Sequence, residues 1–404
     1  MKSYRANYTA LLIAETLAMI GFGLSSPVIP LFLEEDIGIT DPVKLNAWVG
    51  FIQSAAYITL AIFAPIWGHL ADRYSRRAML IRAMFGGGLI ISLMTFVNSP
   101  WQLLVLKAIQ GSLTGTVAAA TVLTASITPA AQLAFALGLL QTMIQVGNSL
   151  GPLIGGILSD FFGYRAAFFS TGLTLGLAAL IVFKWVDKDV PPSPETKISR
   201  LSLIPDMRPV AASPLLVTIM LVTLGVNMAV NAATPMLPLF LKSLASGSSE
   251  APAHIASSSG IVLGVGAAFT ALAAALVGKF SSAIGYWRTL FFCLCAGALL
   301  TLPQIFVTNM IQLTVLRAAS SFFAGGAVPV INAIIAVSAD RKHQGTVFGI
   351  NAAAASAGCA IGPMIGSAAA MLSYRAVFFV SALILGLSAA ETQRRRKQRR
   401  AENI

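Results

Sequence analysis

Long apolar segments alternate with short polar ones along the whole chain. Twelve of these segments are long enough to cross a lipid bilayer as helices, because one crossing needs roughly 20 predominantly apolar residues. The pattern therefore predicts an all-α membrane protein with twelve transmembrane helices. We expect these helices at residues 8–33, 47–67, 78–97, 102–124, 133–158, 165–185, 213–241, 255–278, 289–307, 312–336, 346–370 and 375–391.

Composition and charge place the chain in the same class. Of its 404 residues, 56% are hydrophobic and 10% are charged, whereas soluble proteins carry about 25% charged residues. The net charge of +12 comes from basic residues that gather in alternate connecting segments and near the end, from Arg394 to Arg400. This distribution follows the positive-inside rule and argues against a nucleic-acid partner.

The charge pattern also predicts a topology. We expect a multi-pass protein of the cell membrane, monomeric, with both termini in the cytoplasm. The basic tail should contact anionic lipid headgroups at that face.

Two stretches of the chain repeat each other about 210 residues apart. QLLVLKAIQGSLTG from Gln102 is similar to QLTVLRAASSFFAG from Gln312, and YRAAFF from Tyr164 is similar to YRAVFF from Tyr374. Parallel repeats of this kind imply a cavity at their interface and a rocking motion between two six-helix halves related by pseudo-twofold symmetry. The expected parts are an N-terminal half at 1–185, a cytoplasmic linker at 186–212, a C-terminal half at 213–391 and a basic cytoplasmic tail at 392–404.

Small residues are concentrated in the predicted fifth helix, which reads GLLQTMIQVGNSLGPLIGG. Three of its glycines recur every four residues, so they form a smooth strip on which another helix can pack closely. We expect this bent helix to control which side of the membrane a cavity opens to; plain packing is the alternative. The matching segment at 357–366 is interpreted as keeping only the Gly-Pro pair and one later glycine, so the extra glycines of the first half are taken as functional. The residues assigned to this motif are Gly138, Gly147, Gly151, Pro152, Gly155 and Gly156.

Four motifs resemble those of a known transporter family. GHLADRYSRR, from Gly68 to Arg77, resembles the signature loop of the major facilitator superfamily, and the glycine-rich fifth helix resembles its antiporter motif. GFGLSSPVIP from Gly21 and LVLKAIQGSLTG from Leu104 resemble first- and fourth-helix motifs of the twelve-span drug/proton antiporters. The latter carries Lys107 where the family more often has Arg. The resemblance implies the fold of this superfamily and places the chain near bacterial multidrug efflux proteins.

The signature loop combines an acid with several arginines. Asp72 is expected to cap the third helix, where the helix dipole favours an anion. The resemblance implies a further role as a charge latch that holds the end of the second helix in one conformation. A positive-inside loop with a helix cap is the alternative. The residues assigned to this motif are Gly68, Asp72, Arg73, Arg76 and Arg77.

Glu15 is the one acid that lies well inside a predicted helix. A charge at mid-helix costs about 2.5–3.5 kcal/mol on insertion scales, so such groups normally face a cavity or a partner. Burial favours the neutral carboxyl that a proton carrier requires. We predict that Glu15 binds a proton or a cationic substrate; the alternative is an acid that water reaches from the interface. Lys107 is a second candidate for proton coupling, with snorkelling to the outer surface as its alternative.

The other polar residues inside the predicted helices are mostly amides and hydroxyls. Each of them alone is more typical of an interhelical hydrogen bond than of a ligand contact. Together they leave a largely apolar cavity, which suits lipophilic compounds better than a sugar or a phosphate. The predicted substrate-binding residues are Glu15, Met19, Phe22, Gln53, Tyr57, Gln110, Gln141, Gln145, Asn227, Asn231, Asn332 and Asn351.

Nothing in the sequence indicates an enzyme, because there is no Walker loop and the three histidines lie in loops or at helix ends. We expect no cofactor and no metal, with the proton as coupling ion. The sequence predicts a secondary active transporter that exports lipophilic or cationic drugs in exchange for protons by alternating access. The alternatives are a proton-coupled or facilitated transporter of a metabolite or nutrient, and a membrane scaffold or sensor that does not transport.

Overall fold

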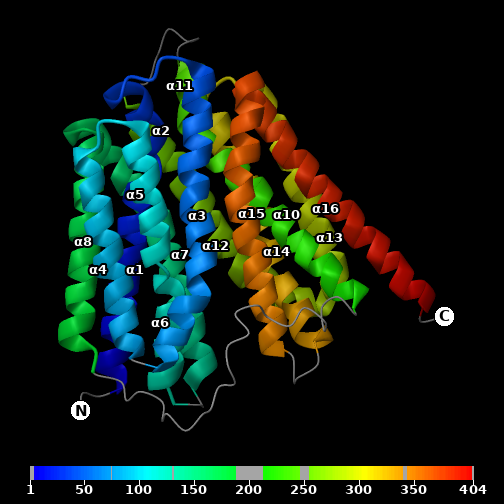
Figure 1. Cartoon of the computed structure of the whole chain (residues 1–404). Helices are drawn as coiled ribbons and strands as arrows, with labels where there is room; N and C mark the ends of the chain where they lie inside the picture. The colour runs from blue at the N-terminus through cyan, green and yellow to red at the C-terminus, as the bar shows by residue number, and fades with distance from the viewer. Residues whose placement is uncertain are drawn as a thin grey trace. The chain divides into compact units, whose positions relative to one another are not determined.

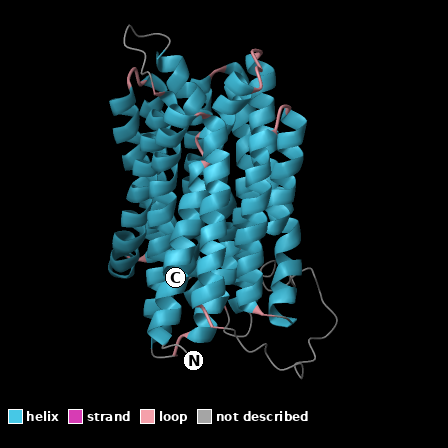
Figure 2. Ribbon diagram, turned by 90° about the vertical axis from the view of Figure 1, so that its left-hand side faces the viewer, coloured by secondary structure: helices cyan, strands magenta, loops and turns pink. Residues whose placement is uncertain are grey.

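The computed structural model describes residues 4–73, 75–129, 132–187, 213–245, 254–339 and 344–402. Across these ranges the regular elements are all helices (Figure 2). This confirms the predicted all-α fold class. The predicted linker at 186–212 lies almost entirely outside the described residues.

The described helices fall into two compact units. The first contains the described residues of Met1–Thr40, Ala55–Leu201 and Pro252–Gly264. The second contains those of Asp41–Ser54, Ser202–Ala251 and Val265–Ile404. Two helices, α3 (Pro42–Arg73) and α12 (Ile255–Ile284), therefore begin in one unit and continue in the other.

The first unit is organised around its N-terminal helix. That helix is α1 (Tyr4–Leu24). Besides it and parts of α3 and α12, the unit contains α2 (Val28–Leu31), α4 (Arg76–Leu93), α5 (Pro100–Leu113), α6 (Thr116–Ile127), α7 (Leu133–Phe162) and α8 (Tyr164–Trp185). Helix α1 packs against α6, α7 and α8, and α4 packs against α8 (Figure 1). A helix that touches three others needs few polar groups on its surface, and α1 carries mostly apolar side chains.

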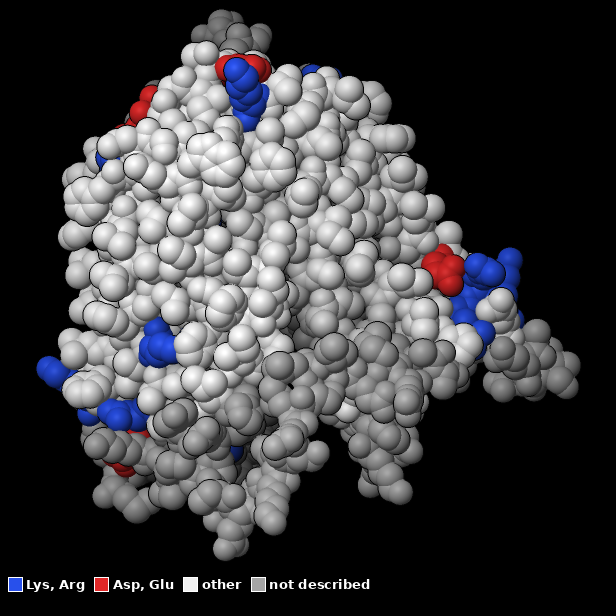
Figure 3. All heavy atoms as spheres, in the orientation of Figure 1, with Lys and Arg blue, Asp and Glu red and all other residues white. Residues whose placement is uncertain are grey.

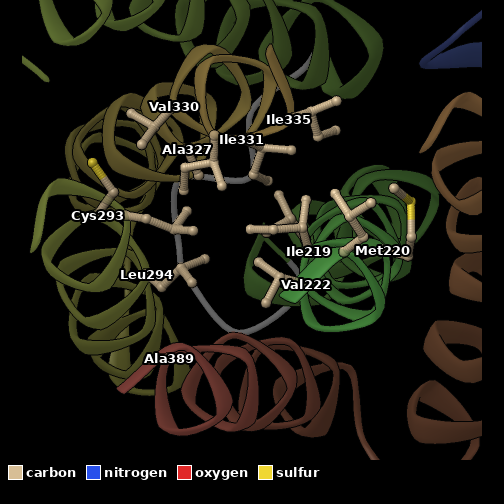
Figure 4. Close-up of a cluster of buried hydrophobic side chains, with 14 of the residues drawn as sticks. Ile219, Met220, Val222, Cys293, Leu294, Ala327, Val330, Ile331, Ile335 and Ala389 are labelled. Carbon is tan, nitrogen blue, oxygen red and sulfur yellow. The ribbon is translucent and has the colours of Figure 1, made fainter. Parts of the chain in front are cut away.

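The second unit has a continuous apolar core. Its helices are α10 (Pro214–Ala233), α11 (Leu237–Ala245), α13 (Tyr286–Thr301), α14 (Met310–Ser338), α15 (Gln344–Leu372) and α16 (Tyr374–Glu402). Figure 4 shows Ile219 and Val222 of α10, Leu294 of α13 and Ile331 of α14 converging in one buried cluster. Helix α10 also packs along α15 and α16, so it has the central position that α1 has in the first unit.

Eleven helical segments in the described part of the chain are long and apolar enough to cross a membrane. One of them, Pro100–Ile127, contains both α5 and α6. The predicted fifth span forms α7, which has 30 residues but is not among the eleven. Its amides Gln141 and Gln145 and its glycines reduce its apolar character. The chain is therefore a multi-pass membrane protein.

The start of α12 is attached to α7 within the first unit. Asp160 of α7 accepts hydrogen bonds from the backbone N–H groups of Ala256 (3.2 Å) and Ser257 (2.7 Å). A carboxylate at this position caps the helix and complements its dipole. Within the second unit, the Ser367 hydroxyl of α15 donates to the Asn46 carbonyl of α3 in a similar way. These contacts explain why the start of α12 belongs to the first unit and the start of α3 to the second.

The structure corrects the expected cap of the third span. Helix α3 continues to Arg73, so Asp72 lies in its last turn. The cap of α4 is Ser75, whose hydroxyl accepts from the Ala78 N–H at 3.2 Å. Ser75 occupies the N-cap because it is the residue that directly precedes the helix in an extended conformation, where a hydroxyl reaches the free N–H groups.

The basic tail extends the last helix. Helix α16 continues through the arginines to Glu402, so most of the predicted tail at 392–404 is helical. Figure 3 shows this basic cluster at the C-terminal end of the helix, beside an acidic group. Arg394 lies 3.7 Å from the Glu391 carboxylate.

Candidate functional site

The glycine strip of α7 packs on the backbone of α1. A Cβ atom at Gly147 would lie 2.5 Å from the Met19 Cβ, and one at Gly151 would lie 2.7 Å from the Gly23 Cα. A Cβ at Gly155 would overlap the Leu24 carbonyl. Since these neighbours are mostly backbone atoms, no side chain can move away to make room. The strip therefore sets the position of α1.

The second unit contains an equivalent strip, which corrects the sequence interpretation. Gly358, Gly362 and Gly366 of α15 pack on the backbone of α10 in the same manner. Gly358 lies 211 residues after Gly147, the same offset that relates the two Gly-Pro pairs. The glycines of the first strip are thus not confined to one half. Gly156 differs, because Ser367 takes its place.

Glu15 lies on α1 one turn before Met19, and it is completely buried. Neither of its carboxylate oxygens has a hydrogen-bond partner among the described residues. Thr116, the first residue of α6 and itself 3% exposed, lies near this carboxyl but is not placed to complete a hydrogen bond with it. A buried carboxyl without hydrogen bonds is costly, so this group is expected to have a function rather than a structural role.

The fourth span is broken where it approaches Glu15. Helix α5 ends at Leu113, Thr114 is extended, and Gly115 has a φ of 121°, a conformation that favours glycine. Helix α6 then begins at Thr116 without a side-chain cap. Just before the break, Gly111 packs against the Ala56 carbonyl of α3, which fixes the end of α5. The sequence prediction of one uninterrupted span at 102–124 missed this break.

Lys107 and Gln110 lie on α5, before this break. Both are buried, and the Gln110 Oε1 has no hydrogen-bond partner among the described residues. Neither Lys107 nor Glu15 takes part in an ion pair within the described part of the chain. The repeat-related base, Arg317 of α14, donates to the Thr234 hydroxyl at 3.0 Å. The structure therefore does not bring Lys107 and Glu15 into one pair.

Amides of the second unit form a hydrogen-bonded network of their own. The Thr223 hydroxyl donates to the Asn351 Oδ1 at 2.7 Å. Asn227 donates to the Thr223 carbonyl, and Asn231 donates to the Asn227 carbonyl, both at 2.9 Å. Asn231 also lies 3.4 Å from the Cys359 sulfur. The network brings three predicted substrate-binding residues together, and each of them makes at least one hydrogen bond within the unit.

The remaining predicted substrate-binding residues are dispersed. Met19 is buried against Gly147, and the Phe22 ring lies beside Gly87 of α4. Gln145 accepts from Asn148 at 3.2 Å. Gln141 and Asn332 are exposed, and Gln53 and Tyr57 are half-buried. The structure does not bring these four residues into one site.

Part of the signature loop ties α4 to α8. The Arg77 guanidinium donates to the Val182 carbonyl at 3.3 Å and to the Phe183 carbonyl, so it satisfies the last turn of α8. Arg76 follows the Ser75 cap. Only the helical backbone of Gly68, Asp72 and Arg73 is described, and their latch role remains a prediction.

Sequence reasoning missed three residues of functional interest: Thr116, Thr223 and Gly358. The segment Thr114-Gly115-Thr116 contained a signal, because a glycine between two β-branched residues weakens a helix. Thr223 could be identified only from packing. Gly147 packs on Thr16 and Ile20 of α1, and its equivalent Gly358 packs on Leu224 and Met228 of α10, so Thr16 corresponds to Leu224. The residue before Leu224 is thus the equivalent of Glu15.

No group of three or more His, Cys, Asp or Glu side chains is placed to hold a metal ion in the described part of the chain. The three cysteines are free.

Comparison with known proteins places this arrangement in a family. The family profile described as Major Facilitator Superfamily matches residues 11–310 and 259–402. The multidrug resistance protein MdtG of Proteus mirabilis is 32% identical over 366 residues, which cover 90% of this chain and 89% of that protein. MdtG of Enterobacter lignolyticus is 32% identical over 391 residues, which cover 96% and 92%.

Solved structures show the same fold at low sequence identity. The nucleoside transporter NupG has a TM-score of 0.78 and 14% identity, with 96% of this chain and 98% of that chain covered. A bacterial homologue of the human lysosomal transporter Spinster has a TM-score of 0.75 and 15% identity, with 97% of both chains covered. The chain therefore belongs to the major facilitator superfamily and is a multi-pass membrane transporter, not an enzyme.

Proposed function

We propose that this chain exports lipophilic or cationic drugs in exchange for protons by alternating access. The observation that carries the proposal is Glu15, a fully buried and unpaired carboxyl on the central helix of the first unit. Such a group can hold a proton or attract a cation, and one occupant excludes the other. Relatives named as multidrug resistance proteins support the direction and the substrate class.

The amide network of the second unit also favours lipophilic substrates. Recognition of a sugar or nucleoside requires several free hydrogen-bond partners at fixed positions. Asn227 and Asn231 instead donate to carbonyls of their own helix, α10, and Asn351 of α15 accepts from the Thr223 hydroxyl.

A proton gradient supplies enough energy for this exchange. One charge crossing about 100 mV releases about 2.3 kcal/mol. Since about 1.4 kcal/mol corresponds to a tenfold ratio, one proton supports a ratio of about forty-fold for a neutral drug. For a monovalent cation the one-for-one exchange moves no net charge, so the pH difference alone drives it.

The topology belongs to the same proposal. We place the chain in the cell membrane with both termini in the cytoplasm, where the α16 arginines contact anionic headgroups. We also propose that Lys107 assists proton coupling and that Asp72 of the signature loop forms a latch with the neighbouring arginines. The transporter is proposed to act as a monomer.

Reconstituted vesicles with an imposed pH gradient test the exchange. We expect the lipophilic cation tetraphenylphosphonium to trigger proton release from purified protein, and the gradient to drive its accumulation. Glu15→Gln should abolish both responses, while Glu391→Gln, which changes a partly exposed carboxylate in the same way, should abolish neither. Transport that is unaffected by Glu15→Gln contradicts the role of this carboxyl. Transport of a compound in the same direction as the proton would favour a metabolite symporter. If no compound is transported, the result would favour a scaffold.

A further inference from the structure

The uncapped start of α6 packs against the helix that carries Glu15, and its first residue, Thr116, lies near the Glu15 carboxyl. The first hydrogen bond of α6 joins the Ala119 N–H to the Gly115 carbonyl at 3.2 Å. The N–H groups of Thr116, Val117 and Ala118 therefore have no partner within the helix. Free N–H groups and the helix dipole attract negative charge at this end. The break in the fourth span thus places a seat for an anion within the membrane, next to a buried acid that lacks hydrogen bonds.

No other charge competes for this seat on the helices around α1. Helix α6 contains no ionisable residue, and the one ionisable residue of α7, Asp160, is bonded to the start of α12. Helix α8 carries Tyr164, Arg165 and Lys184, which all lie in its first or last turn. On α1 itself the other ionisable residues are Tyr4, Arg5 and Tyr8, in its first turns.

Helices α4 and α5 each carry a basic residue inside their span. Helix α4 touches α1 at Gly87, and its basic residue inside the span, Arg82, stacks on the Trp67 ring of α3 at 3.4 Å. Lys107 lies on α5 about two turns before the break. The start of α6 is therefore the positive group that packs directly on the Glu15 helix.

The second unit supports a link between the acid and the break. Thr223 stands in the place of Glu15, and its hydroxyl is bonded to Asn351. Gly325 of α14 lies 210 residues after Gly115, in the middle of a continuous helix and without a positive φ. The unit without the acid thus has no break in the equivalent helix.

We propose that the start of α6 binds the ionised Glu15 carboxylate and releases it when the carboxyl is protonated. The Thr116 hydroxyl and the first N–H groups of α6 donate to the carboxylate, and Gly115 gives the backbone its turn at this point. When a proton from water binds a carboxylate oxygen, the charge disappears and the attraction to the helix start weakens. Thr116 and Gly115 are then positioning residues for the coupling group. This inference rests on the proposed role of Glu15 in proton-coupled export.

Infrared titration of the Glu15 carboxyl in the purified transporter tests the inference directly. The band of the protonated acid, identified by its absence in Glu15→Gln, should disappear as pH rises. Thr116→Val removes one hydrogen bond to a charged acceptor, so the midpoint should move up by about one pH unit. Thr116→Ser should restore the original midpoint. Thr121→Val on the same helix, where the hydroxyl bonds only to its own helix at Val117, is the matched control and should leave it unchanged.

The pH profile of exchange gives a second readout. The midpoint of tetraphenylphosphonium-driven proton release should move with the infrared midpoint in Thr116→Val, while the maximal rate stays within about twofold of the original. An infrared midpoint that is unchanged in Thr116→Val overturns the inference, whatever happens to transport. If instead the midpoint moves but Glu15→Gln still exchanges drug for protons, the seat exists and the proposed function fails.

Discussion

The two units share one packing frame but differ in the residue at the Glu15 position and in the helix beside it. In both, three glycines on one helix press against the backbone of the central helix, α1 or α10. In the first unit the frame holds Glu15 beside a broken span, and in the second it holds Thr223 beside the continuous α14. A repeat that keeps its packing and changes this position separates the scaffold of the protein from its chemistry.

Moving the acid to the other unit should have the largest effect. We expect the double variant Glu15→Gln with Thr223→Glu to show no proton-coupled exchange. A new carboxylate at Thr223 would meet the Asn351 Oδ1 and no helix start, and a charge within a span costs about 2.5–3.5 kcal/mol. Tetraphenylphosphonium-driven proton release in vesicles measures this, with Glu15→Gln alone as control. Recovery of most of the original rate would show that the two positions are interchangeable.

Adding one methyl group to each glycine strip should separate packing from chemistry. A Cβ at Gly151 and one at Gly362 would each lie 2.7 Å from a backbone atom, so Gly151→Ala and Gly362→Ala are a matched pair. Each should lower the free energy of unfolding by about 1–3 kcal/mol through overpacking. Gly151→Ala should also displace Glu15 and reduce exchange about tenfold, because about 1.4 kcal/mol in the barrier is tenfold in rate. Equal loss of exchange in both variants would assign the strips to packing alone.

The two repeat-related bases should respond in opposite directions. Arg317→Met removes the hydrogen bond to Thr234 and should lower stability by about 1–2 kcal/mol. Lys107→Met removes a buried cation without a bonded partner and should leave stability unchanged or raise it. Thermal unfolding of the purified variants measures both. Loss of exchange in a fully stable Lys107→Met variant would support its role in coupling, and a large fall in its stability would contradict the comparison.

The smallest effect is expected at Thr223 itself. Thr223→Val leaves the Asn351 Oδ1 without its donor, which should destabilise the protein by about 1 kcal/mol. The pH profile of exchange should not change, because the second unit holds no acid at this position. A shift of that profile would mean that Thr223 takes part in coupling, and would remove the contrast between the units.

The sequence predicted the helices well because a membrane span has a simple signature. A run of about 20 apolar residues is visible without knowledge of tertiary contacts. Glu15 was found for the same reason, since an acid inside such a run is unusual. The family motifs, from Gly68 and from Gly138, carried the family assignment.

The backbone break and the equivalence of the two strips were not found from the sequence. Apolar character along a window is insensitive to a single turn, so the segment around Gly115 resembled an unbroken helix. The sequence interpretation matched the Gly-Pro pair and Gly366 but not Gly358, whereas the contacts of α15 with α10 relate all three glycines to those of α7. Asp72 was expected to cap the third span, but Ser75 does so. Helix ends depend on backbone geometry that residue type only partly specifies.

Neither compact unit comes from one continuous stretch of chain, and this has a consequence for biosynthesis. The first unit includes residues up to Gly264, whereas Asp41–Ser54, which is synthesised early, belongs to the second unit. Domains generally fold in the order in which the ribosome releases them. Here the nascent first unit remains unfinished until the beginning of α12 has emerged and met Asp160. The two units must therefore mature together, and a chain cut in its linker would give fragments that each lack a piece of their own unit.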